Sequence, residues 1–338
     1  MCKRVAPDPE ERGIDRSEVD KPRVRKVLSV QHDTHYAYQE SVQQAYHLAF
    51  LRPADTALQT VLARSVLVDP VPDVEHETRD SFGNWRHYFC LHRPHRTLTV
   101  KSSFRVGLAA GSELSEAARA CAWRTVREEL GYAAGRPYQA AAEFAFASPF
   151  VPHDDTLRDY AMEVFCEEPG LVAACERLNQ RIFADFTYAP QATGVDTPTL
   201  EAFKRRAGVC QDFAHIMIAG LRSLGLGARY VSGYLLTRPP PGQARRRGVD
   251  ASHAWVAVYC PGTESGWLEF DPTNGIRAEQ DHVRLAHGRD FGDVSPLRGV
   301  IQGGGDHHLR VAVTVEEGNA GEASVGLVDP SADQDAKR

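Results

Sequence analysis

The stretch 208–215, with the sequence GVCQDFAH, delivers a cysteine directly after a glycine turn. Apolar residues recur at helical spacing over 213–224, and Gly225 and Gly227 follow as a stop signal. This spacing predicts a buried helix that carries Cys210 in its first turn.

Cys210 would face the unpaired N–H groups and the positive end of that helix, which favour a thiolate over a thiol. The same N–H groups can bond an oxyanion formed beside the sulfur. Two strand-like segments follow downstream: His253 opens the alternating run HAWVAVY, and Asp271 ends WLEFD before a proline that stops the ladder. Cysteine, histidine and aspartate in this order are an arrangement for acyl transfer through a thioester.

Four segments, GVCQDFAH, ARYVSGYL, HAWVAVY and WLEFDPTNG, together resemble the core of the transglutaminase-like superfamily. The similarity is greatest to a bacterial branch whose members are named as cysteine proteases. VQHDTHYAYQESVQQAYHLAFLRP and DSFGNW resemble the β-rich N-terminal domain of that branch, and HGRDFGDVSPLRGVIQGGG resembles its C-terminal segment. The resemblance implies that Cys210 is the nucleophile, His253 the base and Asp271 the orienting group. It also implies a peptide or protein amide as substrate, and it requires no metal or organic cofactor.

The order of patterns predicts an α+β fold, because short strands come first and helices then precede a second group of strands. The resemblance implies a papain-like, transglutaminase-like core, with helices packed on an antiparallel sheet. A β-rich, sandwich-like N-terminal domain would precede this core, and residues 311–315 would form a last strand. The expected segments are a disordered leader (1–26), the β-rich domain (27–110), a linker with a helix (111–155), the catalytic domain (156–315) and a disordered tail (316–338).

Composition narrows the class of protein. A net charge of -6 argues against a nucleic-acid partner, which usually meets a basic face. We find no apolar run long enough to span a membrane, and residues 1–25 have no apolar core of a secretory signal. These features predict a cytoplasmic protein with no membrane partner. Seven cysteines without short regular spacing do not indicate a disulfide framework.

Other candidates have weaker support from the sequence. Tyr188 lies upstream, where this superfamily often supplies a group near the oxyanion, and Gln211 is adjacent to the nucleophile. Asp212 is expected to cap the Cys210 helix, and His215 to pack behind the site. The stretch 288–296 is expected to form a structural network of ion pairs and turns.

The histidine pairs 32/35, 92/95 and 307/308 have no second pair of ligands at zinc spacing, so no metal site is predicted. The leading hypothesis is therefore a thiol enzyme acting on amide bonds, by hydrolysis as in a cysteine protease or by transglutaminase-type transfer. The alternative is a binding or scaffold protein that keeps the fold without turnover. The sequence leaves open the substrate, the oligomeric state, the role of the N-terminal domain and whether residues 238–248 form a lid.

Overall fold

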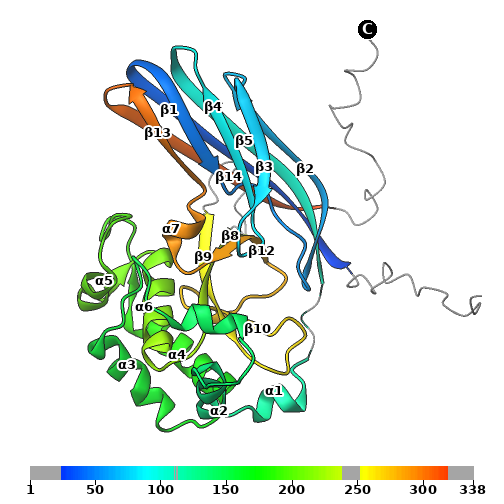
Figure 1. The fold of residues 1–338 in the computed structure, drawn as a ribbon, viewed down its shortest axis with the longest axis vertical. Helices are drawn as coiled ribbons and strands as arrows, with labels where there is room; N and C mark the ends of the chain where they lie inside the picture. Colours follow the sequence, from blue (N-terminus) through cyan, green and yellow to red (C-terminus); the bar gives the residue numbers. More distant parts are fainter. Residues whose placement is uncertain (1–23, 110, 112, 238–251, 319–338) are drawn as a thin grey trace, which may run out of the picture.

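The computed structural model describes residues 24–109, 111, 113–237 and 252–318. Figure 1 shows a β-rich part and a helical part at opposite ends of the molecule, with strands β8, β9 and β12 between them. This mixed architecture with antiparallel sheets confirms the predicted α+β fold class. Most of the predicted leader and tail, and the loop 238–248, lie outside the described residues.

The first sheet is antiparallel and seven-stranded within the described residues. Its strands are β1 (Val24–Ala49), β2 (Gln59–Asp69), β3 (Val74–Arg79), β4 (Trp85–Leu91), β5 (His95–Ala109), β13 (Leu297–Gly303) and β14 (His307–Gly318). The long β1 strand organises it, because one half of β1 pairs with β5 and β14 and the other half with β4 and β13. The ladder is irregular between Ala37 and Val42, so the sheet bends there and its two halves enclose one core.

The end of the chain contributes two strands to this first sheet. β13 and β14 follow one edge of β1 in succession, joined by Gly303, Gly304 and Gly305, which all have positive φ angles that favour glycine. The expected strand at 311–315 is therefore present, within β14. However, residues 156–315 were expected to form one catalytic domain, whereas β13 and β14 pair with β1 in the N-terminal sheet. A local pattern identifies a strand but not the sheet to which it belongs.

The helical part begins where the linker was expected. Its elements are α1 (Glu116–Ala120), α2 (Trp123–Leu130), the 3-10 helix η1 (Ala140–Ala145), α3 (Asp155–Phe165), α4 (Leu171–Asp185), α5 (Thr199–Arg205), α6 (Cys210–Ser223) and α7 (Phe291–Val294). α6 is the central helix, and nearly all of its residues are buried. A Cβ atom at Gly220 would lie 3.0 Å from the Cβ of Ala161, so glycine allows α3 to pack closely on α6.

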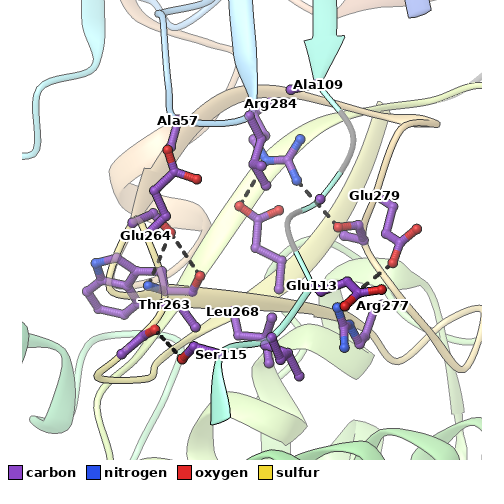
Figure 2. A pocket seen from close by; sticks show the side chains of 18 residues that line it. Ala57, Ala109, Glu113, Ser115, Thr263, Glu264, Leu268, Arg277, Glu279 and Arg284 are labelled. Atoms are coloured by element: carbon purple, nitrogen blue, oxygen red, sulfur yellow. Dashed lines mark hydrogen bonds and ion pairs between the residues drawn. The ribbon is translucent and has the colours of Figure 1, made fainter. Parts of the chain in front are cut away.

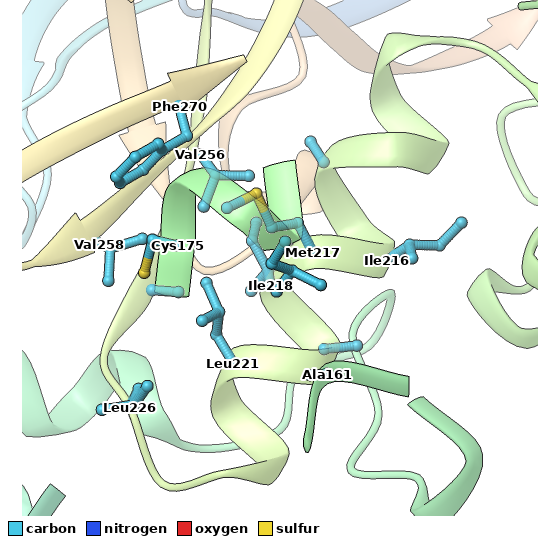
Figure 3. Close-up of a cluster of buried hydrophobic side chains, with 14 of the residues drawn as sticks. Ala161, Cys175, Ile216, Met217, Ile218, Leu221, Leu226, Val256, Val258 and Phe270 are labelled. Carbon is cyan, nitrogen blue, oxygen red and sulfur yellow. The ribbon is translucent and has the colours of Figure 1, made fainter. Parts of the chain in front are cut away.

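A second, five-stranded antiparallel sheet covers α6. Its order is β11 (Ile276–Arg277), β10 (Trp267–Asp271), β9 (Ser252–Tyr259), β8 (Ala228–Leu235) and β12 (His282–Gly288). Figure 3 shows Val256, Val258 and Phe270 of these strands beside Met217 and Leu221 of α6. Burying one such side chain contributes about 1.5–3 kcal/mol, so these contacts hold α6 against β9 and β10.

The opposite face of the second sheet is strongly curled. Glu269 of β10 and Arg284 of β12 form an ion pair at 2.9 Å, although β9 and β8 lie between their strands. Gly233 of β8 permits this curl, because a Cβ atom there would lie 2.0 Å from the Val283 carbonyl oxygen and 2.6 Å from the Trp255 ring. The curl brings side chains from distant strands together on one face.

Side-chain amides of the first sheet region dock onto β12. Gln59 donates to the Arg284 carbonyl at 2.8 Å and accepts from the Arg284 N–H at 2.8 Å. Asn84 makes the same two bonds with the backbone of His287, at 2.7 and 2.9 Å. Both amides are buried, and each replaces a strand partner at an edge that would otherwise be unpaired. The two parts of the chain are thereby held in a fixed relation.

Among the described residues, no helix is long and apolar enough to cross a membrane. The expected cytoplasmic location stays a prediction.

Candidate active site

Cys210 is the first residue of α6 and is partly exposed. The turn before it is held by Asp212, whose carboxylate accepts a hydrogen bond from the Val209 N–H at 2.8 Å and one from the Thr193 hydroxyl at 2.6 Å. Gly208 is required there, since a Cβ atom would lie 2.5 Å from the Asp212 carboxylate. The expected capping role of Asp212 thus has a geometric basis, and it fixes the sulfur at the helix N-terminus.

His253 and Asp271 lie side by side on β9 and β10. His253 Nε2 is 2.7 Å from Asp271 Oδ2, and the two side chains are only 9% and 0% exposed. The charge of Cys210 acts on the same imidazole and raises the pKa of His253, so the sulfur lies within electrostatic reach of the ring. Since Asp271 holds Nε2, Nδ1 is the ring nitrogen left for the sulfur. The structure therefore pairs His253 directly with Asp271 and brings Cys210 near the imidazole.

Two residues that sequence reasoning missed also bind Asp271. His282 Nε2 of β12 lies 3.0 Å from Asp271 Oδ2, and the Asn274 side-chain N–H donates to the same oxygen at 2.7 Å. The other carboxylate oxygen accepts the backbone N–H groups of Thr273 and Asn274, at 3.0 and 3.2 Å. Asp271 is thus a fully hydrogen-bonded anion whose orientation is fixed from several directions.

The electrostatics of the site favour a charged imidazole. Burial disfavours the imidazolium, but the hydrogen bonds and negative charges of Asp271 and Cys210 outweigh it and raise the pKa of His253 to about 10. Burial would raise the pKa of Asp271, but hydrogen bonds from His253, His282 and Asn274 hold it well below its usual range. His253 is therefore protonated and Asp271 ionised at neutral pH.

Trp255 supports the imidazole from the curled face of the sheet. Its ring stacks on His253 at 5.9 Å between centroids and meets His282 edge-on at 5.2 Å. The Trp255 indole N–H donates to Glu269 Oε2 at 2.7 Å, and Glu269 is in turn paired with Arg284. This chain of contacts restricts the rotation of both histidines.

The weaker candidates take different places. Tyr188, in the short strand β6 (Thr187–Tyr188), pairs with Gly208 of β7 (Ala207–Gly208) and is about half exposed. Burial and the charge of Cys210 both raise the pKa of Tyr188, which places its hydroxyl within electrostatic reach of the sulfur. The Gln211 amide instead donates to the Val195 carbonyl at 3.0 Å. Tyr188 therefore remains a candidate near the oxyanion, whereas Gln211 is directed to a neighbouring loop.

His215 and the stretch 288–296 occupy structural positions. His215 is buried behind Cys210, stacks with Phe150, and accepts the Phe291 N–H at 3.2 Å. Arg289 and Asp293 form a two-pronged ion pair with both distances at 2.9 Å. These contacts agree with the structural roles expected for them.

The atoms of His253, Asp271 and His282 lie within 4.8 Å of one another, a spacing that could hold a metal ion. The same atoms are already joined by two hydrogen bonds to one carboxylate oxygen. We interpret the cluster as a hydrogen-bonded network in which Asp271 binds the two imidazoles, rather than as a metal site. The expected lack of a metal cofactor stays a prediction.

Comparisons with known proteins identify the family of the chain. The bacterial transglutaminase-like N-terminal region matches residues 28–107, and the transglutaminase-like superfamily matches residues 158–272. An uncharacterized protein of Mycobacterium tuberculosis is 38% identical over 282 residues, covering 80% of this chain and 86% of that protein. The chain belongs to the transglutaminase-like superfamily. The resemblance predicted from the motifs is thereby confirmed.

Two further matches concern the fold and part of the sequence. A crystal structure named "Putative Cysteine Protease from Cytophaga hutchinsonii" has a TM-score of 0.66, with 21% identity, and covers 86% of this chain and 90% of that one. At this identity the match shows the shared fold alone. A protein-glutamine gamma-glutamyltransferase of Pseudomonas aeruginosa is 36% identical over 132 residues, covering 38% of this chain and 19% of that protein. The transglutaminase-like core is thus shared with a named acyltransferase.

Proposed function

We propose that this transglutaminase-like protein is a thiol enzyme that acts on amide bonds of peptides or proteins through a thioester on Cys210. The observation that carries the proposal is the hydrogen-bonded pair of His253 and Asp271, which lies within electrostatic reach of Cys210 at the N-terminus of α6. His253 is charged at neutral pH, so it already holds the proton that an amine leaving group requires.

The reaction then follows from the roles of three groups. The Cys210 sulfur attacks the amide carbonyl, and the carbonyl oxygen takes the negative charge. Backbone N–H groups at the start of α6 stabilise that charge, with the Tyr188 hydroxyl as a second candidate donor. The C–N bond breaks as His253 gives its proton to the departing amine, which leaves a thioester on Cys210.

The thioester is resolved by a second nucleophile. Water gives hydrolysis, as in a cysteine protease or amidase, while an amine gives transamidation. In both cases His253 accepts a proton from the attacking group as the C–S bond breaks and the thiolate returns. The catalytic residues are the same for both outcomes, which depend instead on access of water and amines to the cleft.

The first test is the pH dependence of iodoacetamide alkylation at Cys210 in wild type and His253→Asn. Cys166 is an exposed cysteine of the same chain and serves as the internal control. We expect Cys210 to react at a pH well below about 8.5, the value of a free thiol, and the variant to lose this reactivity. If Cys210 reacts no faster than Cys166, the pair is inactive, and the scaffold alternative replaces the enzyme hypothesis.

A partition experiment separates hydrolysis from transfer. Glutamine-containing peptides are incubated with the protein in the presence of hydroxylamine as a competing amine. Hydroxamate formation at the expense of free acid indicates that the thioester accepts amines. Free acid alone, at an unchanged rate, indicates hydrolysis.

A further inference from the structure

A cavity of about 240 Å³ lies between the first sheet region and the curled face of the second sheet. Its walls include Leu58 and Phe82 from the first part of the chain and Arg229, Val231 and Leu285 from β8 and β12. The triad residues Cys210 and His253 do not line it. It is therefore a separate feature of the fold, at the junction of the two parts.

The walls of this cavity are fixed by direct hydrogen bonds. Asn84 lines it and bonds the backbone of His287, and Gln59 bonds the backbone of Arg284, another lining residue. A neighbouring cavity of about 320 Å³ shares Leu58, Glu269 and Arg284 with it, and Figure 2 shows Arg284 at that common wall. Preformed walls reduce the ordering cost of binding a ligand.

Arg229 is the distinctive side chain in the cavity. Arg229 of β8 pairs with Ala257 of β9, and Ala257 pairs with Glu269 of β10. The three residues therefore form one row across the sheet. The guanidinium stacks over the Trp267 ring at 4.1 Å. Its Nε atom is enclosed and has no hydrogen-bond partner among the described residues. The side chain as a whole is only partly buried, so a ligand in the cavity would meet the two terminal nitrogens of the guanidinium.

The local charge is positive. Arg229 and Arg284 share one buried carboxylate, Glu269, which already accepts two direct hydrogen bonds, from Arg284 and Trp255. Burial and the charge of Arg284 lower the pKa of Arg229, whereas Glu269 raises it, and the balance of about 10 leaves the group charged at neutral pH.

The other ionisable side chains of the cavity do not cancel this charge. Arg79 adds a third cation, and Asp55 on the exposed rim accepts the Val61 N–H at 2.7 Å. Burial, together with the charge of Arg229, lowers the pKa of His287 to about 3 and keeps it neutral. Three arginines thus face two carboxylates.

We propose that this cavity binds a small aliphatic carboxylate, whose anionic end pairs with Arg229 and whose carbon chain lies against Phe82, Val231 and Leu285. The guanidinium fork matches a planar carboxylate in two parallel hydrogen bonds. A dianionic phosphate fits less well, because Glu269 and Asp55 would repel its second charge. The volume of about 240 Å³ has room for a short carbon chain.

Isothermal titration of the full chain with butyrate tests this proposal, with butyramide as the neutral analogue and inorganic phosphate as the second anion. We expect butyrate to bind and butyramide not to bind. Arg229→Gln should weaken butyrate binding by about 10- to 100-fold, the effect of losing a charged hydrogen-bonding partner, and Arg229→Lys should weaken it less. Arg277→Gln is the matched control, because Arg277 lines the neighbouring cavity but not this one and already faces Glu176 and Glu279.

A second measurement uses wild type alone, in case the Arg229 variants do not fold. The Trp267 indole N–H resonance should shift with the same dissociation constant as the calorimetric titration, since this ring stacks on Arg229. Butyrate binding that is equal in wild type and Arg229→Gln would overturn the proposal, as would stronger binding of phosphate or butyramide. A peptide with a free C-terminus, compared with its amidated form, distinguishes a peptide carboxylate from a free small acid. Catalysis at Cys210 is not required for any of these outcomes.

Discussion

Replacement of Asp271 by asparagine removes one negative charge while keeping the size of the side chain and an oxygen that can accept hydrogen bonds. In the native site the pKa of His253 rises from 6.5 to about 10, against the opposing effect of burial. That difference favours the imidazolium by roughly 5 kcal/mol, at 1.36 kcal/mol per pH unit. An adjacent opposite charge accounts for shifts of about 1–3 pH units. The variant should therefore lower the pKa of His253 by about 2 units or more.

The assay is an NMR titration of ¹³C-labelled histidine, with the His253 resonance assigned from His253→Asn. His282→Gln is the matched control, because it removes the second imidazole but leaves the carboxylate 2.7 Å from His253. In the control the pKa of His253 should remain within about one unit of the native value. Turnover in Asp271→Asn should fall by about 10²–10⁴-fold, as expected when the orienting carboxylate of a triad is lost. An unchanged pKa of His253 in Asp271→Asn would refute the electrostatic reasoning.

Three further predictions concern stability. Gly233→Ala places a methyl group 2.6 Å from the Trp255 ring and should lower the free energy of unfolding, measured in urea titrations, by about 3 kcal/mol. Gly194→Ala is the control, because a Cβ atom there has no neighbour within 4 Å and should change the free energy of unfolding little. Asp212→Ala removes the cap of α6 and should cost about 1 kcal/mol and slow alkylation at the helix N-terminus; equal stability and labelling would contradict the capping role. His47→Phe should stabilise the fold by about 1–3 kcal/mol, because both buried ring nitrogens of His47 have no hydrogen-bond partner in the described part of the chain. Burial lowers the pKa of His47 to about 4, so the wild-type protein should lose stability as pH falls from 6.5 towards 4, whereas His47→Phe should not. The two proteins are compared by thermal unfolding at pH 5 and pH 8. If the variant is stabilised by the same amount at both pH values, His47 does not link stability to pH.

The proposed catalytic residues could be singled out from the sequence because each carries a local signal. Cys210 opens a strongly periodic helix, and His253 and Asp271 mark the ends of short strands on neighbouring segments of the chain. The helix and the strands each form through local preferences, and antiparallel neighbours in sequence usually pair. Only the packing of the Cys210 helix against these two strands is then needed to bring the three residues near one another.

His282 and Arg229 could not be found in this way. His282 reaches Asp271 only because the sheet curls, which depends on the glycine at position 233 and on the packing of Trp255. Arg229 appears in the sequence as an ordinary polar position of a strand, and its place in a cavity depends on long-range docking of the first sheet region. The pairing of β14 with β1 is likewise set by contacts between the two ends of the chain.

The central claim is that Cys210 forms a thioester, and acyl-enzyme trapping tests it most directly. p-Nitrophenyl acetate is a suitable probe because an activated ester does not need a matched substrate pocket. After acid quenching, peptide mapping by mass spectrometry should locate the acetyl group on Cys210 in wild type, removable by hydroxylamine and much slower to form in His253→Asn. Acetylation spread evenly over the accessible cysteines, with Cys210 not preferred and no effect of the His253 substitution, would contradict the proposed mechanism.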